Sequence, residues 1–111
     1  MINTILTASG IPYRQGRFYN PPAETYAVIF DDQEVSGPDL IEIEFGAPLI
    51  VRHDCTVELY EPTPDPEAEA AFEAELLSRS ITWTKQARYW LQNVQRYQVI
   101  YEFSYTEKRR N

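Results

Sequence analysis

Few residues of this chain could carry metal or covalent chemistry. His53, Asp54 and Cys55 form the only cluster of metal-ligand types, and the sequence holds 1 His and 1 Cys. In an extended strand His53 and Cys55 point to one face and Asp54 to the other, so the three cannot converge on an ion. A cysteine nucleophile would also need an orienting third group. We therefore expect a packed cysteine beside an edge histidine, with no metal and no cofactor.

Other catalytic patterns are missing from the sequence as well. No serine lies in a Gly-x-Ser-x-Gly context, and the glycines lack the spacing of a phosphate-binding loop. A group of glutamates could in principle hold an acid–base pair; its members are Glu67, Glu69, Glu73 and Glu75. On the first turns of an exposed helix, however, carboxylates are usually solvated and complement the helix dipole. The prediction is a protein that is not an enzyme.

Charge is divided unevenly along the chain, whose net charge is −7. Residues 1–75 carry 15 acidic residues against three arginines, a net of −12, whereas residues 76–111 carry seven basic residues against two acidic ones, a net of +5. Such polarity favours head-to-tail contacts between copies, which can close into a ring. The alternative is that opposite charges pair within one fold. The acidic total argues against a general nucleic-acid-binding domain.

The hydrophobic patterns predict two helices. Residues 2–9 have apolar positions at helical spacing and end at Gly10, a residue that readily adopts a left-handed conformation. Residues 66–78 follow Asp65, a good N-cap, and carry one apolar stripe through Phe72 and Leu76. Extended segments are predicted over 11–18, 26–30, 81–85 and 97–105, an acidic loop over 31–39, and a long β-hairpin over 40–60.

These elements predict an α+β fold. At 111 residues the chain has the length of one domain. We expect a single α+β domain over 1–107, mainly an antiparallel β-sheet with a long hairpin and two helices packed on one face, followed by a basic tail over 108–111. No apolar run reaches the ~18 residues that a membrane helix needs, so no membrane partner is expected. The lone cysteine fits a reducing compartment.

Aromatic side chains gather in the last third of the chain. Together with Arg88 and Arg96 they could form a stacking platform for single-stranded nucleic acid; they are Trp83, Tyr89, Trp90, Tyr97, Tyr101 and Tyr105. Trp, Tyr and Arg are also the residues that protein–protein hot spots favour. Because the chain is acidic overall, we interpret the set as part core and part protein interface.

Several landmarks follow one another in an order that resembles a known family. They are Ser9–Pro12, Pro21-Pro22, Tyr26–Val28, Val57–Tyr60, Pro64–Glu67, Ile81–Thr84 and Tyr97–Phe103. Their order and spacing resemble the tail completion, or tail-terminator-like, head–tail joining proteins of long-tailed bacteriophages and prophages. The resemblance implies a virion subunit, made in the host cytoplasm, that assembles as a ring, commonly a hexamer. Its implied partners are the major tail tube protein and the head completion or connector protein.

The resemblance also suggests roles for the charged residues. An acidic lumen would repel phosphate and let DNA pass without specific binding. The acids that we hypothesise to face the lumen or a partner ring are Asp31, Asp32, Glu34, Asp39, Glu42 and Glu44. The residues that we hypothesise to form the subunit interface are Arg79, Lys85, Arg88, Trp90, Arg96, Lys108, Arg109 and Arg110. Two alternatives remain: a connector-side head completion protein, and an acidic DNA mimic that inhibits a host nuclease.

Overall fold

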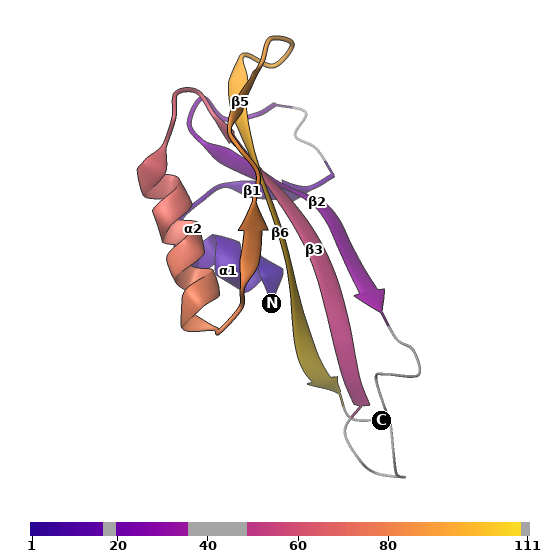
Figure 1. The fold of residues 1–111 in the computed structure, drawn as a ribbon. Coiled ribbons are helices and arrows are strands. Elements are labelled where there is room, and N and C mark those ends of the chain that lie inside the picture. Colours follow the sequence, from indigo (N-terminus) through magenta and orange to yellow (C-terminus); the bar gives the residue numbers. More distant parts are fainter. Residues whose placement is uncertain (17–19, 36–48, 110–111) are drawn as a thin grey trace.

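The computed structural model describes residues 1–16, 20–35 and 49–109. In chain order its elements are α1 (Ile2–Ser9), β1 (Tyr13–Gln15), β2 (Tyr26–Val35), β3 (Leu49–Glu61), α2 (Pro66–Ser78), β4 (Trp83–Lys85), β5 (Tyr89–Leu91) and β6 (Arg96–Arg109) (Figure 1). Within the described residues the strands form one six-stranded sheet in the order β1-β2-β3-β6-β4, and β5 also pairs with β6. These pairs are antiparallel except β1 with β2. The expected α+β fold is confirmed.

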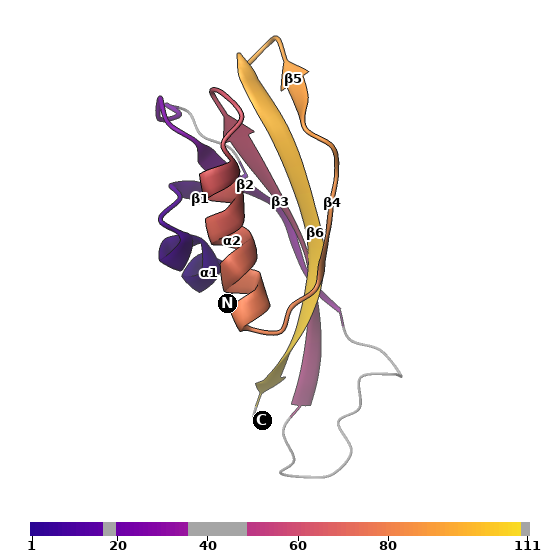
Figure 2. The ribbon, with the colours of Figure 1, turned by 60° about the vertical axis from the view of Figure 1, so that its left-hand side comes forward.

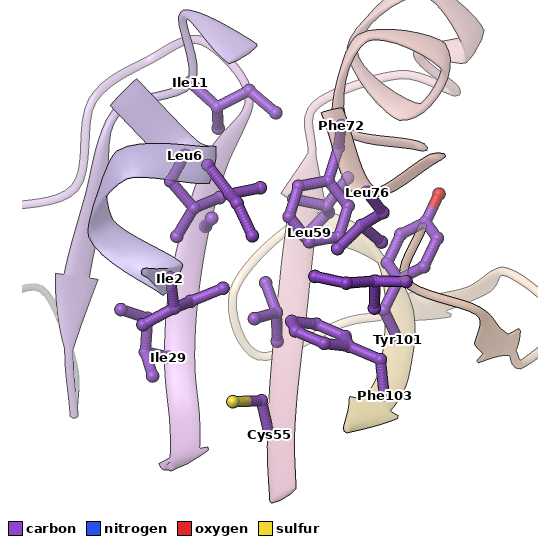
Figure 3. Close-up of a cluster of buried hydrophobic side chains, with 14 of the residues drawn as sticks. Ile2, Leu6, Ile11, Ile29, Cys55, Leu59, Phe72, Leu76, Tyr101 and Phe103 are labelled. Atoms are coloured by element: carbon purple, nitrogen blue, oxygen red, sulfur yellow. The ribbon is translucent and has the colours of Figure 1, made fainter. Parts of the chain in front are cut away.

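Both helices pack on the same face of the sheet (Figures 1 and 2). They contribute buried apolar side chains to one core, which Figure 3 shows in close-up. At its centre the Phe72 ring of α2 lies edge-on to Tyr101 and Phe103 of β6, with centroids 4.9 and 6.1 Å apart. Burying a large apolar side chain contributes roughly 1.5–3 kcal/mol. This layer therefore holds the helices on the sheet.

The helix ends have local causes. α1 stops because Gly10 takes the left-handed conformation, with φ 74°, and its N–H bonds to carbonyls of the last turn. α2 starts where the Asp65 side chain accepts a hydrogen bond from the backbone N–H of Ala68 at 3.1 Å. The Thr25 hydroxyl donates to the other carboxylate oxygen of Asp65 at 2.5 Å. That bond ties the start of α2 to the segment that enters β2.

The central strands β3 and β6 alternate strictly between two faces. Toward the helices β3 presents a buried series at every second position: Val51, His53, Cys55, Val57, Leu59 and Glu61. The residues between them are half-buried or exposed. β6 pairs with β3 over thirteen positions, from Glu61↔Tyr97 to Leu49↔Arg109. The ends of these two strands extend past the helices, which gives the molecule a length of 52 Å (Figure 1).

The structure corrects several predicted boundaries. β2 continues through Val35, so the expected loop over 31–39 is a strand in its first five residues. A register shift between Ile29 and Asp31 marks a β-bulge at Phe30. β3 pairs with β2 on one edge and with β6 on the other. The hairpin thus consists of β2 and β3, and the arm expected over 40–45 lies outside the described residues. β6 runs through Arg109, so it includes two residues of the expected basic tail.

Candidate functional site

Five charged side chains meet where the end of β3 lies against α2. Arg88 donates from Nε to Glu61 Oε1 at 3.0 Å, and its Nη2 bonds to Glu69. Lys85 Nζ lies 2.8 Å from Glu69 Oε1 and 2.8 Å from Glu73 Oε2. We call these five residues the charge cluster. Because Lys85 ends β4 and Arg88 precedes β5, the cluster ties the segment between these strands to α2 and β3.

The positions of the three glutamates explain why they meet. Glu69 and Glu73 are four residues apart on α2 and so share one side of the helix. Glu61 continues the core-facing series of β3 and is fully buried, with 0% exposure. The Tyr101 hydroxyl donates to Glu73 Oε2 at 2.5 Å, and the Lys85 ammonium lies 5.6 Å from the centre of the Tyr101 ring. The charge cluster therefore borders the apolar core directly.

The two buried glutamates differ in their affinity for a proton. Burial, reinforced by the neighbouring Glu69, raises the pKa of Glu61 to about 7. Burial also acts to raise the pKa of Glu69, but hydrogen bonds from Glu61, Lys85 and Arg88 outweigh it and lower that pKa to about 2. Glu61 Oε2 is buried, and no hydrogen-bond donor in the described residues reaches it. Protonated Glu61 would donate a hydrogen bond to Glu69, and its proton would leave two carboxylates to balance the two cations of the charge cluster.

The cations of the predicted subunit interface bond largely to their own chain. Lys85 and Arg88 belong to the charge cluster, and Arg79 Nη1 lies 2.6 Å from Glu75 Oε2 one helical turn earlier. Arg96 donates from Nη1 to its neighbour's carbonyl at 3.0 Å and from Nη2 to the Pro22 carbonyl at 3.3 Å. Arg79, Lys85 and Arg88 thus follow the alternative in which opposite charges pair within one fold. Their charges are neutralised by glutamates of the same subunit.

The predicted aromatic set divides between the core and the surface. Tyr101 and Tyr105 are buried, and Trp83 packs against the same core. By contrast, Tyr89 is 45% and Trp90 41% exposed on β5. These aromatics therefore do not form one continuous platform for stacking bases. The exposed pair lies at the projecting end of the β5–β6 hairpin (Figure 2).

The remaining predicted residues lie near the opposite end of the sheet or outside the described residues. In β2, Asp31, Asp32 and Glu34 stand opposite Thr56, Cys55 and His53 of β3. In β6, Lys108 and Arg109 stand opposite Ile50 and Leu49 of β3. An acidic strand and a basic strand end therefore flank the same end of β3. Asp39, Glu42, Glu44 and Arg110 lie outside the described residues.

The His53–Cys55 segment has the geometry that strand alternation requires. His53 stacks on Tyr105 with centroids 4.8 Å apart, and its Nε2 lies 3.0 Å from Glu107 Oε1. On the other face Asp54 accepts a hydrogen bond from Ser104 at 2.7 Å. That bond holds the pKa of Asp54 below its ordinary value, against slight desolvation. Across residues 1–16, 20–35 and 49–109 there is no group of three His, Cys, Asp or Glu side chains able to hold a metal ion.

A chain of hydrogen bonds crosses the outer face of the sheet from β5 to β3. The Tyr89 hydroxyl bonds to Gln98 Oε1, Gln98 Nε2 donates to the Tyr60 hydroxyl at 3.0 Å, and that hydroxyl donates to Glu58 Oε1 at 2.7 Å. Burial, with the bond to Glu58, raises the pKa of Tyr60. The chain borders a groove of about 450 Å³ whose floor includes Tyr60 and Tyr26, with stacked rings 5.2 Å apart. It fixes the base of the β5–β6 hairpin to the body of the sheet.

Sequence reasoning missed two of these functional candidates. Glu61 is the sixth core-facing position of an alternating strand, and that alternation was the available signal. Gln98 follows Tyr97 in β6, and its type and position gave no comparable signal. No helix in the described part of the chain is long and apolar enough to cross a membrane.

Compared with known proteins, the chain matches no family model, no curated protein and no solved structure.

Proposed function

We propose that this chain is a structural subunit of the head–tail junction of a long-tailed bacteriophage. Copies of it form a ring that completes the tail tube, docks to the capsid connector and lets DNA pass. The observation that carries the proposal is the open sheet: β1 borders it on one side, β4 and β5 border it on the other, and the two edges are unlike each other. Two unlike edges suit a head-to-tail contact, and such contacts close into rings.

The distribution of charge supports a passage that does not grip DNA. A protein binds duplex DNA by neutralising phosphates with free lysines and arginines. Here Arg79, Lys85 and Arg88 are bonded to glutamates of the same chain, and the net charge is −7. We therefore expect no binding of duplex DNA at physiological salt.

The same contacts disfavour an acidic DNA mimic. Such an inhibitor needs rows of free carboxylates near the spacing of phosphates. The glutamates of α2 and the end of β3 do not supply them, because Glu61, Glu69, Glu73 and Glu75 are bonded to the cations described above. On the outer face Asp54 is bonded to Arg52 and Ser104.

Imaging of the purified protein tests the proposal. We expect mass photometry and negative-stain electron microscopy to show six-fold rings with a central hole, formed alone or after coexpression with the cognate major tail tube protein. Pull-down against the tail tube protein and, separately, the connector protein decides on which side of the junction the ring docks. A protein that stays monomeric with both partners, or that retards duplex DNA in a gel at physiological salt, would overturn the proposal.

A further inference from the structure

We propose that the ring is built by pairing β1 of one copy with β5 of the next, with Arg14 opposite Tyr89 and Tyr13 opposite Trp90. This inference rests on the proposed function, because it names the contact between subunits of the proposed ring. The occupant of each edge is a second copy of this chain.

The two strands are suited to each other in direction and length. Among the described strands β1 pairs only with β2, and β5 pairs only with β6. Figure 2 shows β1 and β5 on opposite sides of the molecule. β1 is parallel to β2, and each further step through β3 and β6 to β5 reverses direction. β1 of one copy therefore meets β5 of another in antiparallel orientation, and each strand has three residues.

The pleat of β1 places its side chains on known faces. Tyr13 stands beside Ala27, a core residue of β2, and packs against the core on the helix side. Arg14 is the next residue and so belongs to the outer face. Its side chain is exposed, and within the described part of the chain it forms no ion pair. The edge of β1 thus presents an uncompensated cation on one face and an aromatic ring on the other.

The pleat of β5 divides its aromatic residues in the same way. Trp90 stands opposite Tyr97 on the helix side, and its ring lies edge-on to the Tyr97 ring at 5.0 Å. Tyr89 stands opposite Gln98 and bonds to it on the outer face. Trp90 is 41% exposed and Tyr89 is 45% exposed. The edge of β5 therefore presents one aromatic ring on each face.

The register between β1 and β5 follows from the requirement that paired residues lie on the same face of the sheet. Residues directly opposite each other in a sheet share a face, and a slip of one residue would set helix-side residues against outer residues. Pairing Arg14 with Tyr89 and Tyr13 with Trp90 satisfies this condition. On the outer face this register places the Arg14 guanidinium against the Tyr89 ring. On the helix side it places the Tyr13 and Trp90 rings together. A shift by two residues would oppose Arg14 to Leu91 and lose both interactions.

Each copy carries one edge of each kind, so the contact is heterologous. Closing the ring would pair every β1 with a β5 of the next copy. In the free subunit the shortness of both strands, and the charge on β1, limit indiscriminate sheet extension. The interaction is therefore selective for a partner that supplies an aromatic residue opposite the arginine.

Disulfide trapping between two variants tests the register. Arg14→Cys and Tyr89→Cys are mixed and oxidised mildly; the native thiol, Cys55, is only 3% exposed and does not compete. Opposed residues in antiparallel strands have Cβ atoms about 4.5–5.5 Å apart, close to what a disulfide needs. We expect the mixture to give a covalent dimer in several-fold higher yield than either variant alone.

Two matched controls use other exposed positions. Trp90→Cys lies one residue along the same strand but on the opposite face, and Leu77→Cys lies on α2 with 68% exposure. Mixed with Arg14→Cys, both should give only the yield of random collision. Yields equal to that of the Tyr89→Cys mixture would overturn the proposed register.

A charge substitution measures the contact without cysteines. Arg14→Glu should reduce the fraction of ring several-fold in mass photometry, whereas Arg14→Lys, which keeps a cation, should retain most of it. Rings that persist in Arg14→Glu, together with failed trapping, would overturn the edge contact and leave the proposed ring standing. Specific trapping by a protein that never forms rings would support the contact and refute the ring. Monomers without trapping would refute both.

Discussion

Glutamine in place of Glu61 tests whether the charge cluster holds a proton. Glu61 is fully buried, and burial together with Glu69 raises its pKa from 4.5 to about 7. Between these two pH values the folded protein keeps a proton that the unfolded chain has lost. For a carboxyl group with a raised pKa, the free energy of unfolding is highest below 4.5, falls as pH rises and levels off above about 7.

The size of this loss follows from the same interval. From 4.5 to about 7, at about 1.4 kcal/mol per pH unit, the loss is about 3 kcal/mol. Glutamine is neutral at every pH, and its amide can donate to Glu69 as the protonated acid would. We therefore expect Glu61→Gln and wild type to unfold with similar free energies near pH 4, and the variant to be more stable by about 3 kcal/mol near pH 8.

Urea denaturation followed by tryptophan fluorescence measures the difference at each pH. Urea is preferred because guanidinium ions would screen the cluster. The control is Glu67→Gln, an exposed glutamate in the first turn of α2, for which we expect a change below about 0.5 kcal/mol that does not grow with pH. A difference between Glu61→Gln and wild type that stays constant across the range would mean that Glu61 is ionised throughout, and would refute the proton assigned to it.

Three further substitutions test the charge cluster, the apolar core and the N-cap of α2. Arg88→Ala leaves two buried carboxylates without their shared cation and should lower the free energy of unfolding by about 3 kcal/mol in urea titrations. Arg88→Lys should recover part of that loss. A free energy of unfolding that does not change in Arg88→Ala would contradict the charge cluster. Phe72→Ala should lower the free energy of unfolding by about 3–5 kcal/mol in thermal melts. Leu77→Ala, on the exposed side of α2, should lower it by less than about 0.5 kcal/mol. Equal losses in the two variants would contradict the orientation of α2. Asp65→Ala removes the cap of α2 and should cost about 1 kcal/mol, measured by circular dichroism.

The helices could be predicted closely because their signals are local. Asp65 and Pro66 mark the start of α2, and its apolar stripe fixes the buried side. Gly10 marks the end of α1 in the same way. These residues act within one or two turns of the position that they determine, so a single sequence carries the information.

The strand partners were harder to predict because they depend on distant residues. Asp31–Val35 is polar and acidic, which favours a loop, yet it pairs with β3 and continues β2. Pairing with a neighbouring strand overrides weak local propensity. The predicted hairpin joined residues adjacent in sequence, whereas β3 takes β6 as its second partner, a strand that follows α2, β4 and β5.

The charge cluster could not be predicted from counts of charge along the sequence. Arg88 and Glu61 are 27 positions apart and meet only once the sheet and α2 are in place. The uneven charge of the two parts of the chain is real, but much of it is compensated inside one subunit. The residue types singled out the aromatics only as one group, and the separation of exposed Tyr89 and Trp90 from buried Tyr101 required the pairing of β5 with β6.

The place of β6 in the chain has a consequence for biosynthesis. β6 follows the other described elements in the chain, yet it borders β3 along one edge and β4 and β5 along the other. A ribosome therefore releases every other element before the strand that joins them. Until β6 has been synthesised, the apolar sides of both helices lack much of the surface that they cover, and non-local pairing of this kind is slow. The subunit thus becomes competent to fold, and then to assemble, only after β6 has been synthesised.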